Sequence, residues 1–222
     1  GQDAVLLRCE GLDTFATVWL NGEQVGRADN MFIPWEFEVA GLLKSGENLL
    51  VVRLDSPTLT LDRIEEQEGK LWSVFYGARP YGRKAQYSFG WDWGPRLPTS
   101  GVWRPVRLCA FKGARLLRVF APAEMRAEAV EVRVRAEVMV LAADTFAVEA
   151  GIERGGQRIS ASRQARLEKG THVVEIPLAV ESAALWWPNG YGAQDLYDLR
   201  VTVGRGGEEC DAHHERLGLR KI

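Results

Sequence analysis

Hydrophobic and polar residues alternate in short runs along the first half of the chain, which is typical of half-buried β-strands. Asn21-Gly22 predicts a two-residue hairpin turn, with a return strand over 24–28. Two more candidate strands cover 32–39 and 48–54. The alternating positions are Val5, Leu7, Cys9, Phe15, Thr17, Trp19, Trp35, Phe37, Val39, Leu50, Val52 and Leu54. This rhythm predicts a β-sandwich.

The alternation breaks down over 56–84. Leu61, Ile64 and the glutamates at 65, 66 and 68 suit a short charged helix that runs into an irregular segment rich in Gly, Pro and Tyr. A loop this long inside a compact domain usually has a function. Strand character returns over 103–108, and Gly113 is the predicted domain boundary.

The second half has a cleaner strand pattern, with apolar residues at every other position over 129–140. Further strands are predicted over 116–120, 146–152, 172–178 and 196–203, with a Gly155-Gly156 hairpin turn and no helix of useful length. This spacing predicts an immunoglobulin-like β-sandwich without the Cys…Trp…Cys hallmark. The expected architecture is therefore all-β, with one β-sandwich domain at 1–112 followed by an immunoglobulin-like β-sandwich domain at 113–222.

The composition excludes several partners. The chain has 222 residues, 28 basic and 30 acidic, with a net charge of −2 and both signs mixed along its length. That distribution offers no basic face to nucleic acid or an anionic membrane. No run of about 18 apolar residues could span a bilayer.

Metal and cofactor chemistry is not indicated. Cys9, Cys109 and Cys210 are an odd number, far apart, with no histidine at ligand spacing, so we expect free, buried thiols. Unpaired cysteines favour a reducing compartment such as the cytoplasm. His172, His213 and His214 are expected at exposed strand ends or in linkers. No phosphate loop or dinucleotide fingerprint is present, and no cofactor is expected.

The densest candidate chemistry lies over 86–95, where Trp91, Asp92 and Trp93 stand between Gly90 and Gly94. Indole faces pack on the apolar C–H faces of a pyranose, and a carboxylate accepts hydrogen bonds from vicinal hydroxyls. The alternative is that both indoles are buried anchors and Asp92 caps a backbone turn. A second aromatic run, over 186–192, is interpreted as a rigid turn that fixes a loop.

A retaining glycoside hydrolase needs two carboxyl groups about 5 to 5.5 Å apart. The glutamates at 65, 66 and 68 look like a solvated helix face, and Glu131 and Glu137 point outward on a strand. None has an evident cause for a shifted pKa. No catalytic residue is therefore assigned.

Four segments resemble glycoside hydrolase family 2 and, within it, the β-mannosidases. Residues 14–38 (TFATVWLNGEQVGRADNMFIPWEFE) look like the sugar-binding-type jelly roll of the family, so the resemblance implies a galactose-binding-like jelly roll for 1–112. Residues 83–108 (RKAQYSFGWDWGPRLPTSGVWRPVRL) are the most specific match. Residues 185–199 (LWWPNGYGAQDLYDL) resemble the end of its immunoglobulin-like domain, and 216–222 (RLGLRKI) resemble the segment that leads into the catalytic barrel. The resemblance implies a parent enzyme that hydrolyses terminal β-mannosides with retention.

The resemblance also implies which residues meet the sugar. In the related enzymes the W-D-W-G-P loop reaches the mouth of a catalytic TIM barrel, so Asp92 and Trp91 would contact the terminal mannose. Trp93, Arg83 and Lys84 would contact it or hold the loop. The acid/base glutamate of the family follows an asparagine, whereas no Asn-Glu pair occurs in this sequence. We therefore expect an inactive fragment that ends where the barrel would begin and that docks on that barrel.

Three other interpretations stay open. The chain could be an independent carbohydrate-binding module, in which the residues at 91–93 suffice for recognition. It could be a pair of adhesion-type sandwiches with a structural role only. It could also come from a β-galactosidase or β-glucuronidase of the same family.

Overall fold

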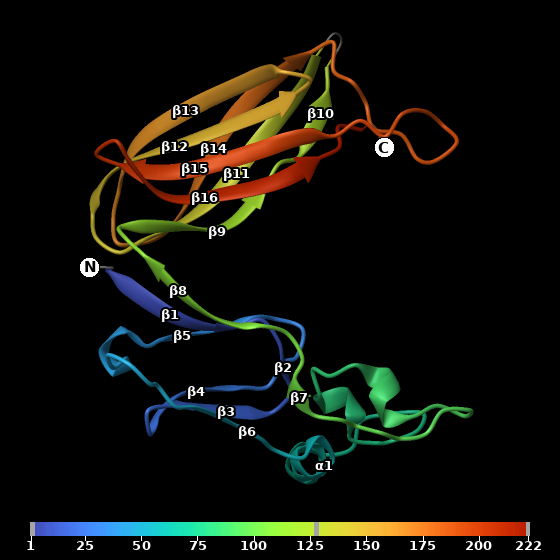
Figure 1. The fold of residues 1–222 in the computed structure, drawn as a ribbon. Coiled ribbons are helices and arrows are strands. Elements are labelled where there is room, and N and C mark those ends of the chain that lie inside the picture. Colours follow the sequence, from blue (N-terminus) through green and yellow to red (C-terminus); the bar gives the residue numbers. More distant parts are fainter. Residues whose placement is uncertain (1–2, 127–128, 221–222) are drawn as a thin grey trace. The chain divides into compact units, whose positions relative to one another are not determined.

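The computed structural model describes residues 3–126 and 129–220. The chain forms two compact units, one of Ala4–Ala110 and one of Gly1–Asp3 with Phe111–Ile222, which we call the first and the second unit. In the described residues the regular structure is nearly all β-strand, with a single α-helix (Figure 1). The prediction of an all-β fold is confirmed. No described helix is long and apolar enough to cross a membrane.

The first unit contains two three-stranded sheets and a two-stranded pair (Figure 1). One sheet has the order β5-β1-β8, the second has the order β4-β3-β6, and β2 pairs with β7. The strands are β1 (Ala4–Cys9), β2 (Leu12–Asp13), β3 (Ala16–Leu20), β4 (Glu23–Ala28), β5 (Trp35–Glu38), β6 (Leu50–Leu54), β7 (Gly101–Val102) and β8 (Val106–Phe111). Both larger sheets contribute to one core, formed by Leu7, Cys9, Leu12, Ala16, Val18, Leu20, Ala28, Phe37 and Val39.

The predicted hairpin turn joins β3 to β4. Asn21 and Gly22 have φ values of 53° and 91°, so the turn uses the left-handed conformations that asparagine and glycine tolerate best. The side-chain amide of Asn21 also donates to the Leu42 carbonyl oxygen at 2.8 Å, and its oxygen accepts from the amide of Leu49 at 2.9 Å. The turn residue therefore also holds the segment that leads into β6.

The predicted charged helix is present as α1 (Pro57–Glu68). Ser56 caps its first turn by accepting from the amide of Leu59 at 3.4 Å, and Gly69 ends it with a φ of 95°. One face of α1 is apolar, and its Leu61 is fully buried. Three short 3₁₀ turns occur elsewhere in the unit: η1 (Ala40–Leu42), η2 (Arg79–Tyr81) and η3 (Gln86–Phe89).

The strand predicted over 103–108 is wrong in its first half. Regular pairing stops at Val102 and resumes at Val106, so Trp103, Arg104 and Pro105 lie outside any strand. The Trp103 ring occupies the space above Gly11, where an added Cβ would lie 2.5 Å from the indole nitrogen. Pro105 has no N–H to donate, and its carbonyl oxygen accepts from the amide of Glu10 at 3.0 Å.

The second unit is built from two four-stranded antiparallel sheets (Figure 1). In one, β11 pairs with β9, β10 and β14; the other has the order β13-β12-β15-β16. The strands are β9 (Ala114–Phe120), β10 (Ala123–Met125), β11 (Ala129–Val140), β12 (Asp144–Arg154), β13 (Gln157–Leu167), β14 (Gly170–Glu181), β15 (Tyr197–Arg205) and β16 (Glu208–Leu217). All five predicted strands of this half are present, and so is the Gly155-Gly156 turn.

The core of the second unit comes from strict alternation. Every second residue of β11, from Val130 to Val140, is buried, and β14 presents the matching apolar residues to the same core. One prediction is wrong here. His213 and His214 lie inside β16, not at a strand end or in a linker, and His213 Nε2 is 3.3 Å from the Glu215 carboxylate.

Candidate functional site

The segment that carries Trp91, Asp92 and Trp93 begins at a buried lysine. Lys84 is 2% exposed, and its ammonium donates to the Asp13 carboxylate at 2.6 Å and to the Thr99 carbonyl oxygen at 2.7 Å. Asp13 also accepts from the hydroxyl of Thr14. Lys84 is therefore kept away from solvent and holds the loop, one of the two roles considered for it. Arg83 is exposed, and its carbonyl oxygen accepts from the amide of Met31 at 3.0 Å.

A small core of its own supports the loop. Phe89 is 2% exposed and packs with Leu61 of α1 and with Ala78. Tyr76 stacks on Phe89 at 5.4 Å between ring centroids, and the guanidinium of Arg96 lies 3.9 Å from the centre of the Tyr76 ring. The loop is thus fixed from beneath by aromatic packing.

The tip of the loop is a tight turn. The amide of Trp91 donates to the Gly94 carbonyl oxygen at 3.1 Å, and the amide of Gly94 donates back to Trp91 at 3.2 Å. Gly90 precedes the turn with a φ of 90°, a conformation that disfavours other residues. Asp92 and Trp93 occupy the two central positions of the turn, and both residues are exposed.

Both indoles of the tip are largely open to solvent, since Trp91 is 53% exposed and Trp93 is 85% exposed. Trp91 packs one side on Phe75, with ring centroids 5.0 Å apart and a tilt of 56°. Together with Tyr87 and Pro95, the two indoles line an open, mainly apolar hollow of about 590 Å³. The indoles are therefore not core anchors of the first unit.

Asp92 stands between the two tryptophans in the sequence and is exposed, but it is not one of the residues that line the hollow. In the part of the chain that the structure describes, its carboxylate forms no hydrogen bond or ion pair, so it does not cap the turn. An exposed carboxylate between two exposed indoles leaves both kinds of sugar contact available: aromatic faces for C–H groups and oxygen atoms for hydroxyls. The role of these three residues in sugar binding stays a prediction.

The hydroxyl of Tyr76 supports the loop from the side. It donates to the Asp62 carboxylate and lies 3.0 Å from the Thr58 carbonyl oxygen, so it ties the loop to α1. Burial, and then the hydrogen bond to Asp62, raises the pKa of Tyr76 above its usual value. The hydroxyl therefore stays protonated, as a donor requires.

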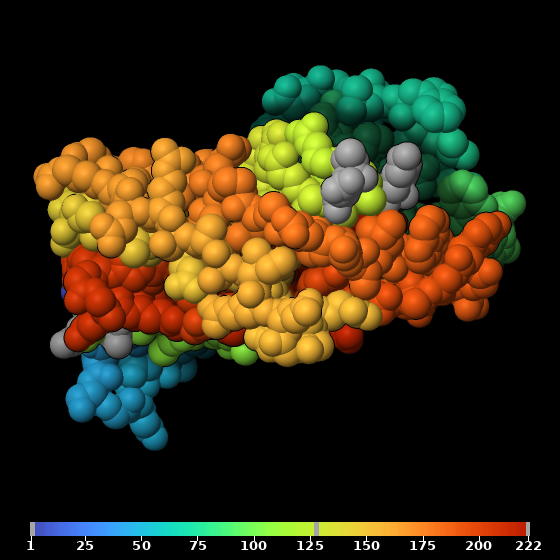
Figure 2. All heavy atoms as spheres, turned by 90° about the horizontal axis from the view of Figure 1, so that it is seen from above, coloured from blue at the N-terminus to red at the C-terminus, as the bar shows by residue number. Residues whose placement is uncertain are grey.

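The second aromatic run forms a loop in the second unit. The amide of Trp186 donates to Leu219 at 2.7 Å and that of Trp187 to Ala193 at 2.8 Å, while Tyr191 is exposed at the end of the loop. This orange loop extends past the neighbouring strands in Figure 1, and its atoms lie on the surface in Figure 2. It holds no exposed carboxylate between its rings.

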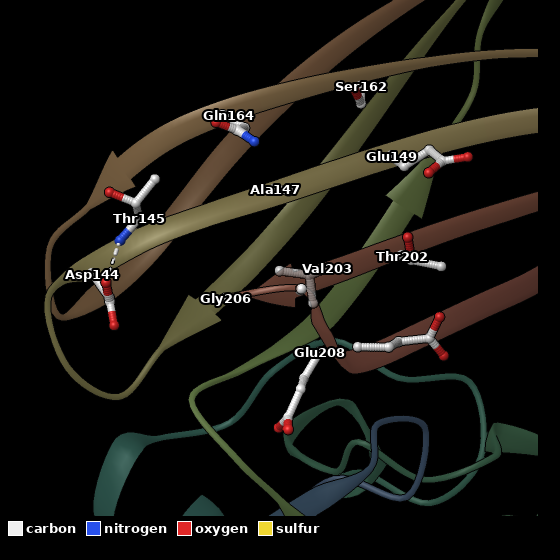
Figure 3. Close-up of a pocket in the computed structure, with 13 residues that line it drawn as sticks. Asp144, Thr145, Ala147, Glu149, Ser162, Gln164, Thr202, Val203, Gly206 and Glu208 are labelled. Atoms are coloured by element: carbon white, nitrogen blue, oxygen red, sulfur yellow. Dashed lines mark hydrogen bonds between the residues drawn. The ribbon is translucent and has the colours of Figure 1, made fainter.

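Another hollow, of about 580 Å³, lies on the outer face of the β13-β12-β15-β16 sheet. Figure 3 shows its acidic side chains, among them Asp144 and Glu149 on β12 and Glu208 at the start of β16. Glu149 is paired with Arg158 at 2.9 Å. The side chains do not converge on one point, so the hollow lacks the geometry of a catalytic site.

No metal centre is evident in the described residues, where no group of three histidine, cysteine or acidic side chains could hold an ion. Cys9 is fully buried, and burial raises the pKa of its thiol. Cys109 and Cys210 are only partly buried, so the expectation of three buried thiols is wrong for these two. All three are free.

Both units match known protein families. A family described as glycosyl hydrolase 2 galactose-binding domain-like matches residues 1–104, and one described as glycosyl hydrolases family 2 matches residues 117–220. β-Mannosidase B of Thermothelomyces thermophilus is 38% identical over 219 residues, which are 96% of this chain and 25% of that protein. β-Mannosidase B of Aspergillus oryzae is 33% identical over 98% of this chain and 26% of its own length. The chain spans about a quarter of the length of these relatives.

Solved structures agree. The crystal structure of a β-D-mannosidase from Dictyoglomus thermophilum superposes with a TM-score of 0.93 at 40% identity, covering 99% of this chain and 27% of that one. A β-glucuronidase from glycoside hydrolase family 2 superposes with a TM-score of 0.69 at 15% identity, covering 98% of this chain and 22% of its own. At that identity the second match supports the fold alone.

Proposed function

The chain belongs to glycoside hydrolase family 2, and from this membership we propose that it is the non-catalytic N-terminal region of a β-mannosidase. The complete enzyme hydrolyses terminal β-mannosides with retention, through a glycosyl-enzyme intermediate. Both catalytic carboxylates belong to a TIM barrel outside these 222 residues, and the two sandwiches dock on that barrel. The identity of 38% to a β-mannosidase B, over almost the whole chain, supports this assignment.

One observation carries the role of the loop: Asp92 is exposed, stands between two exposed tryptophans in the sequence, and forms no hydrogen bond or ion pair with the residues that the structure describes. The base of its loop is anchored by Lys84. A side chain that stabilised the unit would be buried or hydrogen-bonded. We propose that Trp91, Asp92 and Trp93 complete one wall of the sugar site, with the Asp92 carboxylate accepting hydrogen bonds from hydroxyls of the terminal mannose. Hydrogen bonds to a charged acceptor are worth about 1.5 to 3 kcal/mol each.

The loop offers only one wall of a pocket. Sites for small molecules bury most of the ligand surface, whereas the hollow at Trp91 and Trp93 is open. The isolated chain should therefore bind mannosides weakly, and should not hydrolyse an aryl β-mannoside.

The test is a hybrid enzyme in which these 222 residues replace the matching region of the Dictyoglomus thermophilum β-mannosidase. Turnover of a chromogenic aryl β-mannoside is measured for the hybrid, for its Asp92→Asn variant and for the 222 residues alone. We expect activity in the hybrid, none in the chain alone, and a fall in kcat/KM of about 10- to 150-fold for Asp92→Asn. Asp29→Asn, an exposed carboxylate distant in sequence from the loop, is the matched control.

Two results would contradict the proposal. Full activity of the Asp92→Asn hybrid would remove Asp92 from the sugar site. Tight mannoside binding by the isolated chain, lost in Asp92→Asn, would instead favour an independent carbohydrate-binding module.

A further inference from the structure

The loop from Lys84 to Thr99 is closed at its base by one side chain. Lys84 is the first residue of the loop, and its ammonium donates to the carbonyl oxygen of Thr99, the last residue, at 2.7 Å. The same ammonium donates to Asp13, which lies in β2. A single charged group thus joins both ends of the loop to the sheet that supports it.

The hydrogen-bonding capacity of this ammonium is fully used. Lysine has three N–H donors, and three acceptors surround Nζ: both carboxylate oxygens of Asp13 and the carbonyl oxygen of Thr99. The side chains of Lys84 and Asp13 are 1% and 11% exposed, so bulk water does not compete for the contacts. This geometry fixes the position of each end of the loop.

Stability alone does not account for a charged pair at this place. Well-packed apolar residues of similar volume often replace a buried ion pair without loss of stability. An apolar side chain at Lys84 could fill the space, but it could not bind the Thr99 carbonyl oxygen. What the lysine adds is a directional contact to the far end of the loop.

The rest of the loop transmits that contact to its tip. The side-chain amide of Gln86 donates to the Arg79 carbonyl oxygen at 3.1 Å and to that of Lys84 at 3.2 Å, and the amide of Leu97 donates to Ser88 at 3.1 Å. Both sides of the loop are therefore hydrogen-bonded between its base and the turn at 91–94. A displacement of Thr99 would consequently also displace the turn.

We propose that Lys84 is a positioning residue, whose buried ammonium sets where Trp91, Asp92 and Trp93 stand relative to the sugar. This inference rests on the proposed function. It extends that function to the Lys84 ammonium, which does not touch the ligand. Lys84 and its partner Asp13 are 71 residues apart in the sequence. Misplacing a binding group by about 1 Å can cost up to a hundredfold in rate.

The test uses double substitutions, because removing one partner alone leaves a buried charge and could unfold the unit. Asp13→Asn/Lys84→Met removes both charges and the donor to Thr99. Asp13→Asn/Lys84→Gln removes both charges but keeps an N–H donor. Arg53→Met/Asp55→Asn, which neutralises an exposed pair of the same unit with a 3.1 Å contact, is the matched control.

Two readouts separate positioning from bulk stability. Amide hydrogen exchange over 86–98 in the 222-residue chain should accelerate by about tenfold in the methionine variant and less in the glutamine variant, with little change in the β3-β4-β6 sheet. In the hybrid enzyme, kcat/KM should fall by about tenfold to a hundredfold, and the fall should be larger in the methionine variant than in the glutamine variant. The control pair should change neither readout.

Unchanged exchange over 86–98 in the methionine variant would overturn the proposal, as would equal loosening of the whole unit. If exchange accelerates while Asp92→Asn leaves the hybrid fully active, Lys84 still orders the loop, but the proposed function has failed. If Asp92→Asn impairs the hybrid and the Lys84 variants do not, the proposed function stands and the positioning role is wrong.

Discussion

Trp91 and Gly94 exchange two backbone hydrogen bonds, of 3.1 and 3.2 Å, across a turn whose central residues are Asp92 and Trp93. Such a reciprocal pair fixes the backbone of the turn without help from the side chains between. Asp92 and Trp93 are therefore free to serve a ligand, and their replacement should not disturb the fold.

The two tryptophans of the tip should differ in their effect on stability. Trp91→Ala removes the contact with Phe75 at 5.0 Å and should lower the free energy of unfolding by about 1 kcal/mol. Trp93→Ala, at an 85% exposed position, should change it by less than about 0.5 kcal/mol. Urea unfolding followed by far-ultraviolet circular dichroism measures both. A larger loss for Trp93→Ala would mean that its indole is packed in solution.

Single substitutions at the buried ion pair should be severe. Lys84→Met leaves the Asp13 carboxylate buried without its partner, and Asp13→Asn does the same to the ammonium, so each should cost about 3 to 5 kcal/mol of unfolding free energy. The double variant Asp13→Asn/Lys84→Met should cost much less than the sum. A double-mutant cycle from urea unfolding measures the coupling; additive losses would contradict a direct interaction.

Alkaline stability should depend on Tyr76. Its pKa is raised in the folded chain by burial and by Asp62, so above about pH 10 the unfolded chain loses the phenol proton while the folded chain keeps it. The folded state then binds more protons, and stability must fall as pH rises through this range. Tyr76→Phe removes this contribution, so its unfolding free energy should fall less steeply between about pH 9 and 11. Parallel slopes would show that Tyr76 titrates alike in both states.

Thiol reactivity should follow burial. Burial raises the pKa of the Cys9 thiol, and the side chain lies in the core between the two sheets of the first unit. In the native chain at pH 8 a thiol reagent should modify Cys109 and Cys210, which are partly exposed, and should reach Cys9 only after unfolding. Mass spectrometry of peptides after timed labelling distinguishes the three; early modification of Cys9 would contradict the described core.

Alternation of apolar residues predicted most of the strands, because most of them bury one face. It failed for β13 and β16, which the sequence analysis did not identify. Both strands lie at the edges of their sheet, and β13 buries only Leu167 fully. The period-two signal of β13 is weak because Arg163 interrupts it and two of its inward residues are alanines, Ala161 and Ala165. In β16 burial does not alternate along the strand. The domain limits of 1–112 and 113–222 stay a prediction.

The candidate loop was identified from composition, since two tryptophans around an aspartate between glycines are rare. What anchors it could not be identified in the same way. Asp13 and Lys84 are 71 residues apart, and nothing local to either predicts that they meet. The sequence also did not predict whether Trp91 and Trp93 are exposed. Tryptophan is buried on average, and only the geometry of the turn places these two indoles in solvent.

The loop and the sandwich of the first unit have separate cores. In the described residues, the buried cluster of Leu61, Ala78 and Phe89 shares no member with the cluster between the two sheets. Replacing a side chain of the loop cluster therefore leaves no cavity between the two sheets. The part of the first unit around α1 and Phe89 can accordingly open as a local unit while the core between the two sheets stays folded.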